Sequence, residues 1–254
     1  MDTPLEPGSL AGIRALVTGS SRGIGADTAG FLAAAGAKVV INYRNKEPRA
    51  QRVVAGIERA GGEAMAIGAD LTDRDSVALM FSAIRERWGG LDLLVLNASG
   101  GMESGLGEDY ALRLNRDAQV NTLDAALTMM GSGGRVVFVT SHQAHFIEST
   151  PTMPEYELVA RSKRAGEDAL RARADDLAAR GISFVVVSGD MIEGTITATL
   201  LNRARPGAIE ARREAAGRLY SVDEFAAEVA RAAVDPIPED HTRFVGDVTG
   251  FGGA

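Results

Sequence analysis

Short apolar runs alternate with longer segments of helical pattern along the whole chain. The runs are rich in β-branched residues and mostly lack a period of two, which is typical of strands buried on both faces of a sheet. We therefore predict a strand at each run. The predicted strands are residues 15–18, 38–42, 64–68, 91–97, 135–140, 182–187 and 242–245.

The segments between these strands carry the signals of helix ends. Gly36 and Gly181 stand where a helix ends in a left-handed residue, and Asp73 and Ser221 stand where an N-cap is expected. The predicted helices are residues 23–35, 48–60, 73–88, 109–130, 154–180 and 222–234. Strand–helix–strand repetition implies a parallel sheet with right-handed crossovers. The sequence therefore predicts an α/β fold, in which residues 1–254 form a single doubly wound, Rossmann-type domain with a seven-stranded parallel sheet flanked by helices.

One long connection, residues 192–219, falls outside this alternation. Long irregular connections in compact domains are often lids, so we expect this segment to cover a substrate. It contains five arginines, which are Arg203, Arg205, Arg212, Arg213 and Arg218. Two interpretations of these arginines stay open: they attract an acidic group of a substrate, or they form a solvated helix face together with Glu210 and Glu214.

Composition narrows the class of protein. The chain has 254 residues, a net charge of −7 and a pI near 5.1. That balance argues against a nucleic-acid partner, which requires a basic face. Without cysteine there is no disulfide and no thiolate metal site, and three histidines alone suggest no metal. The N-terminus does not resemble a signal peptide and no apolar stretch is long enough to span a bilayer, so we expect a cytoplasmic protein without a membrane partner.

A glycine-rich turn follows the first predicted strand and leads into a helix. Residues 18–25 read Thr-Gly-Ser-Ser-Arg-Gly-Ile-Gly. Glycine permits a tight turn and lets the backbone approach a pyrophosphate. The helix that begins near Gly23 directs free N–H groups and the positive end of its dipole at the phosphates. This turn therefore predicts a dinucleotide site.

The end of the second predicted strand indicates which dinucleotide binds. An NAD site would carry an acidic residue there to hold the ribose 2′-hydroxyl, but the sequence is Tyr43-Arg44-Asn45. Arg44 and Arg22, the latter in the glycine-rich turn, can grip a 2′-phosphate through charged, paired hydrogen bonds. We therefore predict NADP(H) over NAD(H). The alternative is that both arginines are solvated surface charges.

Several motifs together resemble those of the short-chain dehydrogenase/reductase family, over nearly the whole chain. Residues 18–25 match its TGxxxGxG turn, and Asp70-Leu71 resembles its adenine contact. Residues 94–100 are similar to its Asn-Asn-Ala-Gly strand end, with Leu96 and Ser99 at two of the motif positions. The residues that the turn and the resemblance assign to the cofactor are Gly19, Ser21, Arg22, Gly23, Ile24, Gly25, Tyr43, Arg44, Asn45, Asp70, Leu71, Asn97, Ala98, Ser99, Lys163, Ile192 and Thr195.

The same resemblance assigns catalytic positions. Ser141 stands at the position of the family's serine, and Ser162-Lys163-Arg164-Ala165 resembles the segment that carries its lysine. Asn115 falls where the family keeps a helix asparagine. In the strand-to-loop turn after the sixth strand, the family's Pro-Gly reads Gly189-Asp190. The resemblance implies hydride transfer between a nicotinamide and a carbonyl or alcohol carbon, with a tyrosine passing the proton, and a homo-oligomer, either a tetramer or a dimer.

The catalytic tyrosine of that pattern is displaced. The family motif is Tyr-x-x-x-Lys, but Val159 stands four residues before Lys163 and the nearest tyrosine is Tyr156. The shift corresponds to about 4.5 Å of helical rise. We select Tyr156 as a displaced proton donor, together with Ser141, Lys163 and Asn115. The alternatives are that Tyr156 only packs at a helix start, or that His142 or His145 supplies the proton.

Two classes of function therefore remain at this level. The first is an NADP(H)-dependent oxidoreductase acting on a small-molecule carbonyl or alcohol, for example a 3-oxoacyl compound or another ketone. The second is an NADP(H)-binding protein without reductase activity, a redox sensor or structural partner, which the valine at position 159 favours. An enzyme that uses the nicotinamide in another way, such as double-bond reduction, is not separable from the first.

Overall fold

Parallel strands form one sheet in the order β3-β2-β1-β4-β5-β6-β7, in a computed structural model that describes residues 3–102, 107 and 109–252. The strands are β1 (Arg14–Val17), β2 (Lys38–Tyr43), β3 (Glu63–Gly68), β4 (Leu91–Leu96), β5 (Met130–Ser141), β6 (Ser183–Gly189) and β7 (Thr242–Val245). The strand order reverses between β1 and β4, and the carboxyl ends of strands open a crevice at such a point. This arrangement confirms the predicted fold class.

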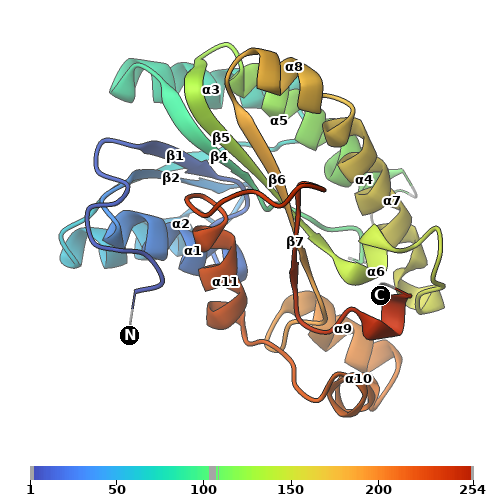
Figure 1. Ribbon diagram of the computed structural model, residues 1–254. Helices are drawn as coiled ribbons and strands as arrows, with labels where there is room; N and C mark the ends of the chain where they lie inside the picture. The colour runs from blue at the N-terminus through green and yellow to red at the C-terminus, as the bar shows by residue number, and fades with distance from the viewer. Residues whose placement is uncertain (1–2, 103–106, 108, 253–254) are drawn as a thin grey trace.

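Helices cover both faces of the sheet (Figure 1). One face carries α1 (Gly23–Ala34), α2 (Glu47–Arg59) and α11 (Val222–Arg231). The other carries α3 (Arg74–Trp88), α5 (Ala118–Ala126), α7 (Pro154–Arg171) and α8 (Ala174–Ala179). Alternate strand residues supply the two apolar clusters beneath these layers: Ala15 and Val17 belong to the first cluster, and Leu16 belongs to the second. The inner strands, such as β1 and β4, are buried on both sides, which explains why they read as continuous apolar runs.

Two predicted helices are interrupted. Residues 109–130 form α4 (Tyr110–Leu112), a π-helical turn η1 (Arg113–Asp117) and α5, and Met130 already begins β5. Residues 154–180 divide into α7 and α8, with Ala172 and Arg173 between them. Neither break carries a glycine or proline. Arg173, at the second break, instead forms ion pairs with Asp124 of α5 and with Asp176 of α8. These two ion pairs fix the chain where α7 ends and α8 begins.

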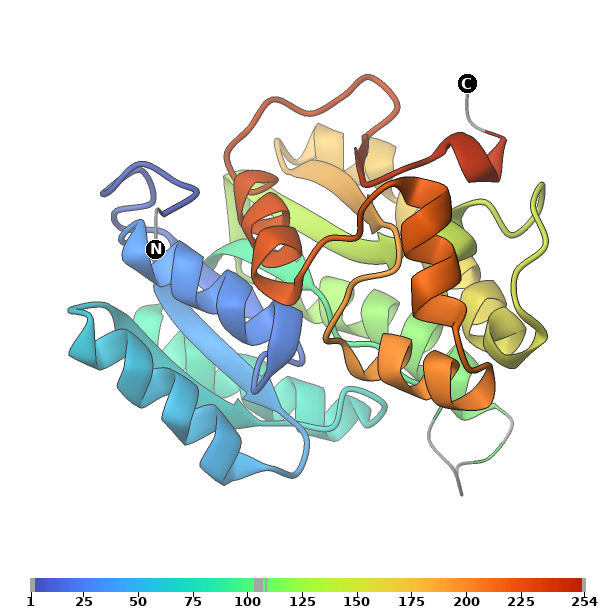
Figure 2. The same ribbon diagram turned by 90° about the horizontal axis from the view of Figure 1, so that it is seen from below.

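The connection at residues 192–219 is helical rather than irregular. It contains α9 (Ile196–Ala204) and α10 (Ala208–Ala216), which lie together at the end of the sheet where β6 finishes (Figure 2). Ile192, at the start of the segment, and Tyr220, directly after it, form an isolated parallel bridge outside the seven strands. Two shorter elements complete the chain: α6 (His142–His145) follows β5, and the 3-10 turn η2 (Thr249–Phe251) follows β7.

The described residues include neither a membrane-spanning helix nor a metal-binding cluster. No helix there is both long and apolar enough to cross a membrane. No group of three or more His, Asp or Glu side chains in that part of the chain is placed to hold a metal ion.

Candidate active site

A cavity of about 610 Å³ lies at the carboxyl ends of the strands. Its walls come from the loops that follow β1 to β6 and from α7 and α9. Every residue that the sequence assigned to a cofactor lines this cavity, from Gly19 to Thr195. Ser141, Tyr156 and Lys163 line it as well. The cavity therefore joins the predicted nucleotide residues to three of the four residues predicted to be catalytic.

The glycine-rich turn approaches the β4 loop too closely for side chains. Gly19 has a φ of +63°, and a Cβ there would lie 3.0 Å from the Cα of Ala98. A Cβ on Gly25 would lie 2.5 Å from Asn97 Nδ2 and 2.9 Å from the carbonyl oxygen of Gly19. Gly23 has a φ of +55° and lines the cavity. Gly19 and Gly25 leave no room for a side chain, and Gly19 and Gly23 have a left-handed backbone conformation. These requirements explain why glycine stands at all three positions of the turn that leads into α1.

Two buried polar residues that the sequence analysis missed hold this turn in place. Asn42, at the end of β2, accepts a hydrogen bond from Gly19 N at 3.1 Å and donates one to Ala69 O at 3.3 Å. The hydroxyl of Thr18 accepts from the backbone N–H groups of Asn97 at 2.9 Å and Ala98 at 3.0 Å. The available signal was a polar residue at the end of an otherwise apolar strand, because a buried polar group needs partners.

One end of the cavity is cationic. Arg22, Arg44, Lys46 and Arg49 all contribute to its lining, and the last two were not singled out from the sequence. The Arg44 guanidinium donates a hydrogen bond to the hydroxyl of Tyr110 and lies 5.7 Å from the centre of its ring. The two residues come from opposite sides of the strand-order reversal, since Arg44 follows β2 and Tyr110 begins α4. This contact fixes a guanidinium at the cavity wall.

Tyr156 lies beside Ser141. Its hydroxyl is 3.2 Å from Ser141 Oγ, although the two residues belong to α7 and the end of β5. α7 begins at Pro154, so Tyr156 stands in its first turn, and the side chain is only 4% exposed. Burial raises the pKa of the phenol, and the hydrogen bond with Ser141 partly opposes that rise. The phenol is therefore neutral at physiological pH and can donate a proton.

Val159, at the family's tyrosine position, belongs to an apolar cluster. It packs with Tyr156, Ala144 and Leu201. A Cβ added to Gly101 would lie 3.3 Å from Val159 Cγ2, so the valine also lies close to that loop. The side chain at position 159 is thus buried in an apolar cluster. Tyr156, about one helical turn earlier, supplies the hydroxyl near Ser141.

Lys163 and Asn115 are both buried. Burial lowers the pKa of the Lys163 ammonium to about 8, against the opposing charge of Glu167. Asn115 does not line the cavity. Its Nδ2 donates to Gly100 O at 2.8 Å and to Ser162 Oγ at 2.9 Å, and its Oδ1 accepts from Gly100 N at 3.3 Å. The side chain of Asn115 thus fastens the β4 loop to α7, and its place among the catalytic residues stays a prediction.

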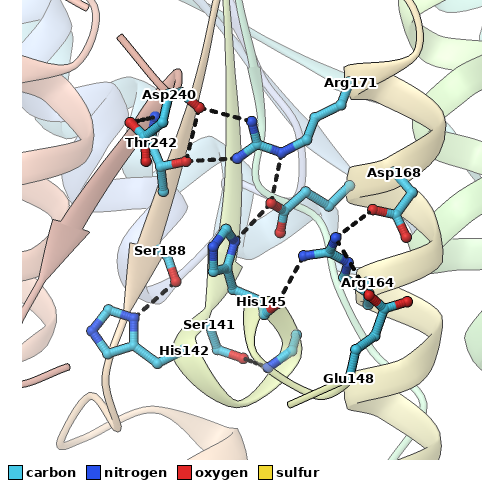
Figure 3. A network of polar contacts seen from close by, with 12 residues as sticks. Ser141, His142, His145, Glu148, Arg164, Asp168, Arg171, Ser188, Asp240 and Thr242 are labelled. Carbon is cyan, nitrogen blue, oxygen red and sulfur yellow. Dashed lines mark hydrogen bonds and ion pairs between the residues drawn. The ribbon is translucent and has the colours of Figure 1, made fainter. Parts of the chain in front are cut away.

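His142 and His145 do not line the cavity, and both form polar contacts with side chains of other elements (Figure 3). His142 Nδ1 lies 2.8 Å from Ser188 Oγ, and its ring packs against Phe251 with 5.5 Å between ring centres. His145 Nδ1 lies 2.7 Å from the carboxylate of Glu167. These positions do not favour the alternative in which a histidine supplies the proton.

The burial of His142 predicts acid sensitivity. Burial and the positive charge of Arg212 lower the pKa of His142 to about 4. The unfolded chain then binds an extra proton between pH 6.5 and 4, so stability is full above pH 6.5 and falls as the pH drops. We expect a loss of up to about 3 kcal/mol in the free energy of unfolding over that range. Urea unfolding at several pH values measures this loss of stability.

His142→Phe should flatten the dependence of the unfolding free energy on pH, whereas His241→Asn should not. Equal dependence on pH in the two variants would contradict the assignment to His142.

Three of the five arginines in residues 192–219 are bound within the chain. Arg212 pairs with both carboxylate oxygens of Asp190 at 2.8 Å, and with Asp247 at 3.0 Å. Arg213 pairs with Glu193, and Arg218 pairs with Glu224. Asp190, which replaces the second residue of the family's Pro-Gly, is 7% exposed and lines the cavity. Arg212 therefore ties α10 to the turn after β6.

The chain matches a protein-family model and named relatives. The model of the short chain dehydrogenase family matches residues 14–205. The hydroxynaphthalene reductase-like protein Arp2 of Metarhizium majus (strain ARSEF 297) is 38% identical to the chain over 188 residues. That match covers 72% of this chain and 69% of Arp2.

Two solved structures match this chain over almost its full length. A short chain dehydrogenase from Burkholderia cenocepacia J2315, in complex with NADP, is 34% identical and has a TM-score of 0.78; the match covers 96% of this chain and 99% of that one. The angucycline C-6 ketoreductase LanV with bound NADP is 28% identical, with a TM-score of 0.75 and coverage of 94% and 95%.

Proposed function

Since the chain belongs to the short-chain dehydrogenase/reductase family and is an oxidoreductase, we propose that it uses NADP(H) to transfer hydride to or from a carbonyl or alcohol carbon. The observation that carries this proposal is the 3.2 Å contact between Tyr156 and Ser141 in the same cavity as the glycine-rich turn. That contact supplies a proton donor despite Val159, and the named reductases among the relatives give no support to a redox sensor without activity.

The residues present fit the cofactor. The turn around Gly23 leaves room at the N-terminus of α1 for a pyrophosphate, because a Cβ on Gly23 would meet no described atom within 4 Å. Arg22 and Arg44 would hold the 2′-phosphate, Asp70 and Leu71 the adenine, and Lys163 the nicotinamide ribose. Ile192 and Thr195, which also line the cavity, would contact the nicotinamide end. The bound cofactor supplies or accepts the hydride.

The protein side chains handle the proton and the substrate oxygen. In the direction of reduction, the neutral phenol of Tyr156 donates its proton to the carbonyl oxygen as that oxygen gains charge. Ser141 Oγ lies close enough to the phenol to donate a hydrogen bond to the same oxygen. Because burial raises the pKa of Tyr156, alcohol oxidation, which needs the phenolate, requires alkaline conditions. We propose carbonyl reduction as the favoured direction near neutral pH.

We further propose that residues 192–219 form a lid over the substrate within one domain spanning residues 1–254. Leu201 of α9 packs with Tyr156 and Val159 in one apolar cluster, so this segment reaches the proposed proton donor. The resemblance also favours a homo-oligomer, with α5 and α7 contributing to an interface, and a small-molecule substrate.

Turnover with a panel of ketones tests the function. Purified protein is incubated with NADPH and ketones that include 3-oxoacyl thioesters, and NADPH oxidation is followed by absorbance. Reduction of at least one panel member supports the proposal. Tight NADPH binding without reduction of any ketone would count against it.

Replacing Arg44 should change the preference between cofactors. A charged hydrogen bond contributes about 1.5–3 kcal/mol, so Arg44→Ala should weaken NADPH binding about 10- to 100-fold and leave NADH binding nearly unchanged. Calorimetry with 2′,5′-ADP and 5′-AMP separates the two effects without turnover. Arg52→Ala, on the exposed side of α2, is the matched control. Equal weakening of both ligands by Arg44→Ala would show that Arg44 does not read the 2′-phosphate.

A further inference from the structure

A fully buried carboxylate stands one helical turn after Lys163. Glu167 is 0% exposed, and its residue number places it on the same face of α7 as Lys163. A buried charge costs several kcal/mol unless it is paired, so such a group needs a structural or functional reason. The catalytic scheme above does not use Glu167.

The contacts of Glu167 leave one of its oxygens unused. Oε1 accepts hydrogen bonds from His145 Nδ1 at 2.7 Å and from Arg171 Nε at 2.9 Å. Oε2 is buried and has no hydrogen-bond partner among the described residues. His145 comes from α6 and Arg171 from α7, so two elements hold the carboxylate in one orientation (Figure 3).

Arg171 is itself fixed at the edge of the sheet. Its guanidinium donates to the backbone carbonyl of Asp240 at 3.0 Å and to Thr242 Oγ1 at 2.6 Å. Burial would raise the pKa of Glu167, but His145 and Arg171 together bring it below its usual range. Glu167 is therefore a carboxylate at neutral pH, with its negative charge fixed beside the helix turn that carries Lys163.

We propose that Glu167 is the buried counter-ion that keeps the Lys163 ammonium charged, and that it is a positioning residue for the proposed reaction. The proposal rests on the role proposed above for Lys163, which holds the ribose as a cation. The charged or titratable groups that face Glu167 are Lys163 and Arg171 from α7 and His145 from α6. His145 and Arg171 both donate to Oε1, and the negative charge of Glu167, one helical turn from Lys163, favours the ammonium form of that lysine.

The charge state of Lys163 can be read directly. The chain contains only three lysines, Lys38, Lys46 and Lys163, so selective ¹³C,¹⁵N-lysine labelling gives three side-chain signals to follow with pH by NMR. In Glu167→Gln, which keeps the shape of the side chain, we expect the midpoint for Lys163 to fall by roughly one pH unit. The midpoints for Lys38 and Lys46 should stay in place. Asp168→Asn, one residue along the same helix, is the matched control and should leave Lys163 unchanged.

The same variants test the consequence for the reaction. Loss of the lysine charge at lower pH should move the alkaline limb of kcat/KM and of NADPH binding to lower pH in Glu167→Gln, and Glu167→Asp should restore part of the shift. If Glu167→Gln does not fold, His145→Gln should produce a smaller shift of the Lys163 midpoint in the same direction. An unchanged midpoint in either folded variant overturns the inference. Because the NMR titration needs no turnover, it stands even if no ketone is reduced.

Discussion

Replacing Tyr156 by phenylalanine is expected to lower kcat for carbonyl reduction by about 100- to 10,000-fold, the usual contribution of a general acid. The change removes only the hydroxyl that lies 3.2 Å from Ser141. The ring stays in its buried place among Val159 and Leu201, so the fold and NADPH binding should be retained. Single-turnover rates, calorimetric binding of NADPH and the melting temperature together separate loss of chemistry from loss of structure.

Tyr220→Phe provides the comparison for this experiment. That tyrosine stacks under Arg218, with 4.2 Å from the guanidinium to the ring centre, and does not line the cavity. Its variant should therefore retain turnover. If Tyr156→Phe kept the wild-type rate, the proton would have to come from another group, and the interpretation of the displaced tyrosine would be wrong.

Gly166→Ala should have the largest effect on stability. A Cβ on Gly166 would lie 1.9 Å from the carbonyl oxygen of Asn115 and 3.0 Å from its carbonyl carbon, which are both backbone atoms. The overlap can be relieved only if α7 moves away from η1. Overpacking of this kind costs about 3 kcal/mol or more, and for a domain of this size that corresponds to a fall in melting temperature of roughly 6–12 °C.

Gly56→Ala is the control for this glycine. Gly56 lies inside α2, where an added Cβ would meet no described atom within 4 Å. The substitution should leave the melting temperature unchanged or raise it, because alanine is the better helix former by up to about 1 kcal/mol. A melting temperature for Gly166→Ala equal to that of the wild type would mean that α7 and η1 are not packed as closely as described.

The inner strands, such as β4 and β6, could be predicted because each buries both faces and therefore reads as an apolar run. The prediction of β6 at residues 182–187 is close to the observed Ser183–Gly189. The start of β5 was missed, because Gly131, Gly133 and Gly134 interrupt its apolar pattern. The break at Arg173 carries no glycine or proline signal either, and the ion pair between Arg173 and Asp124 joins residues 49 positions apart in the sequence.

The candidate site divides in the same way. Residues inside short motifs, such as Gly23 and Lys163, were selected from the sequence and line the cavity. Asn42 and Glu167 were not selected, because Gly19 and His145, which hold them, lie on other elements and no motif records either residue. Whether Tyr156 could approach Ser141 depended on where α7 begins, and the spacing to Lys163 alone could not determine that.

The bridge between Ile192 and Tyr220 brings together the two ends of the segment that contains α9 and α10. Both ends are fixed beside each other, and Glu193 N also donates to Tyr220 O at 2.9 Å. Chain can therefore be added or removed between these points without altering any strand register. A graft that exchanges this segment between relatives should transfer the α9 and α10 wall of the cavity as a unit, together with Thr195, and leave the glycine-rich turn and Arg44 in place.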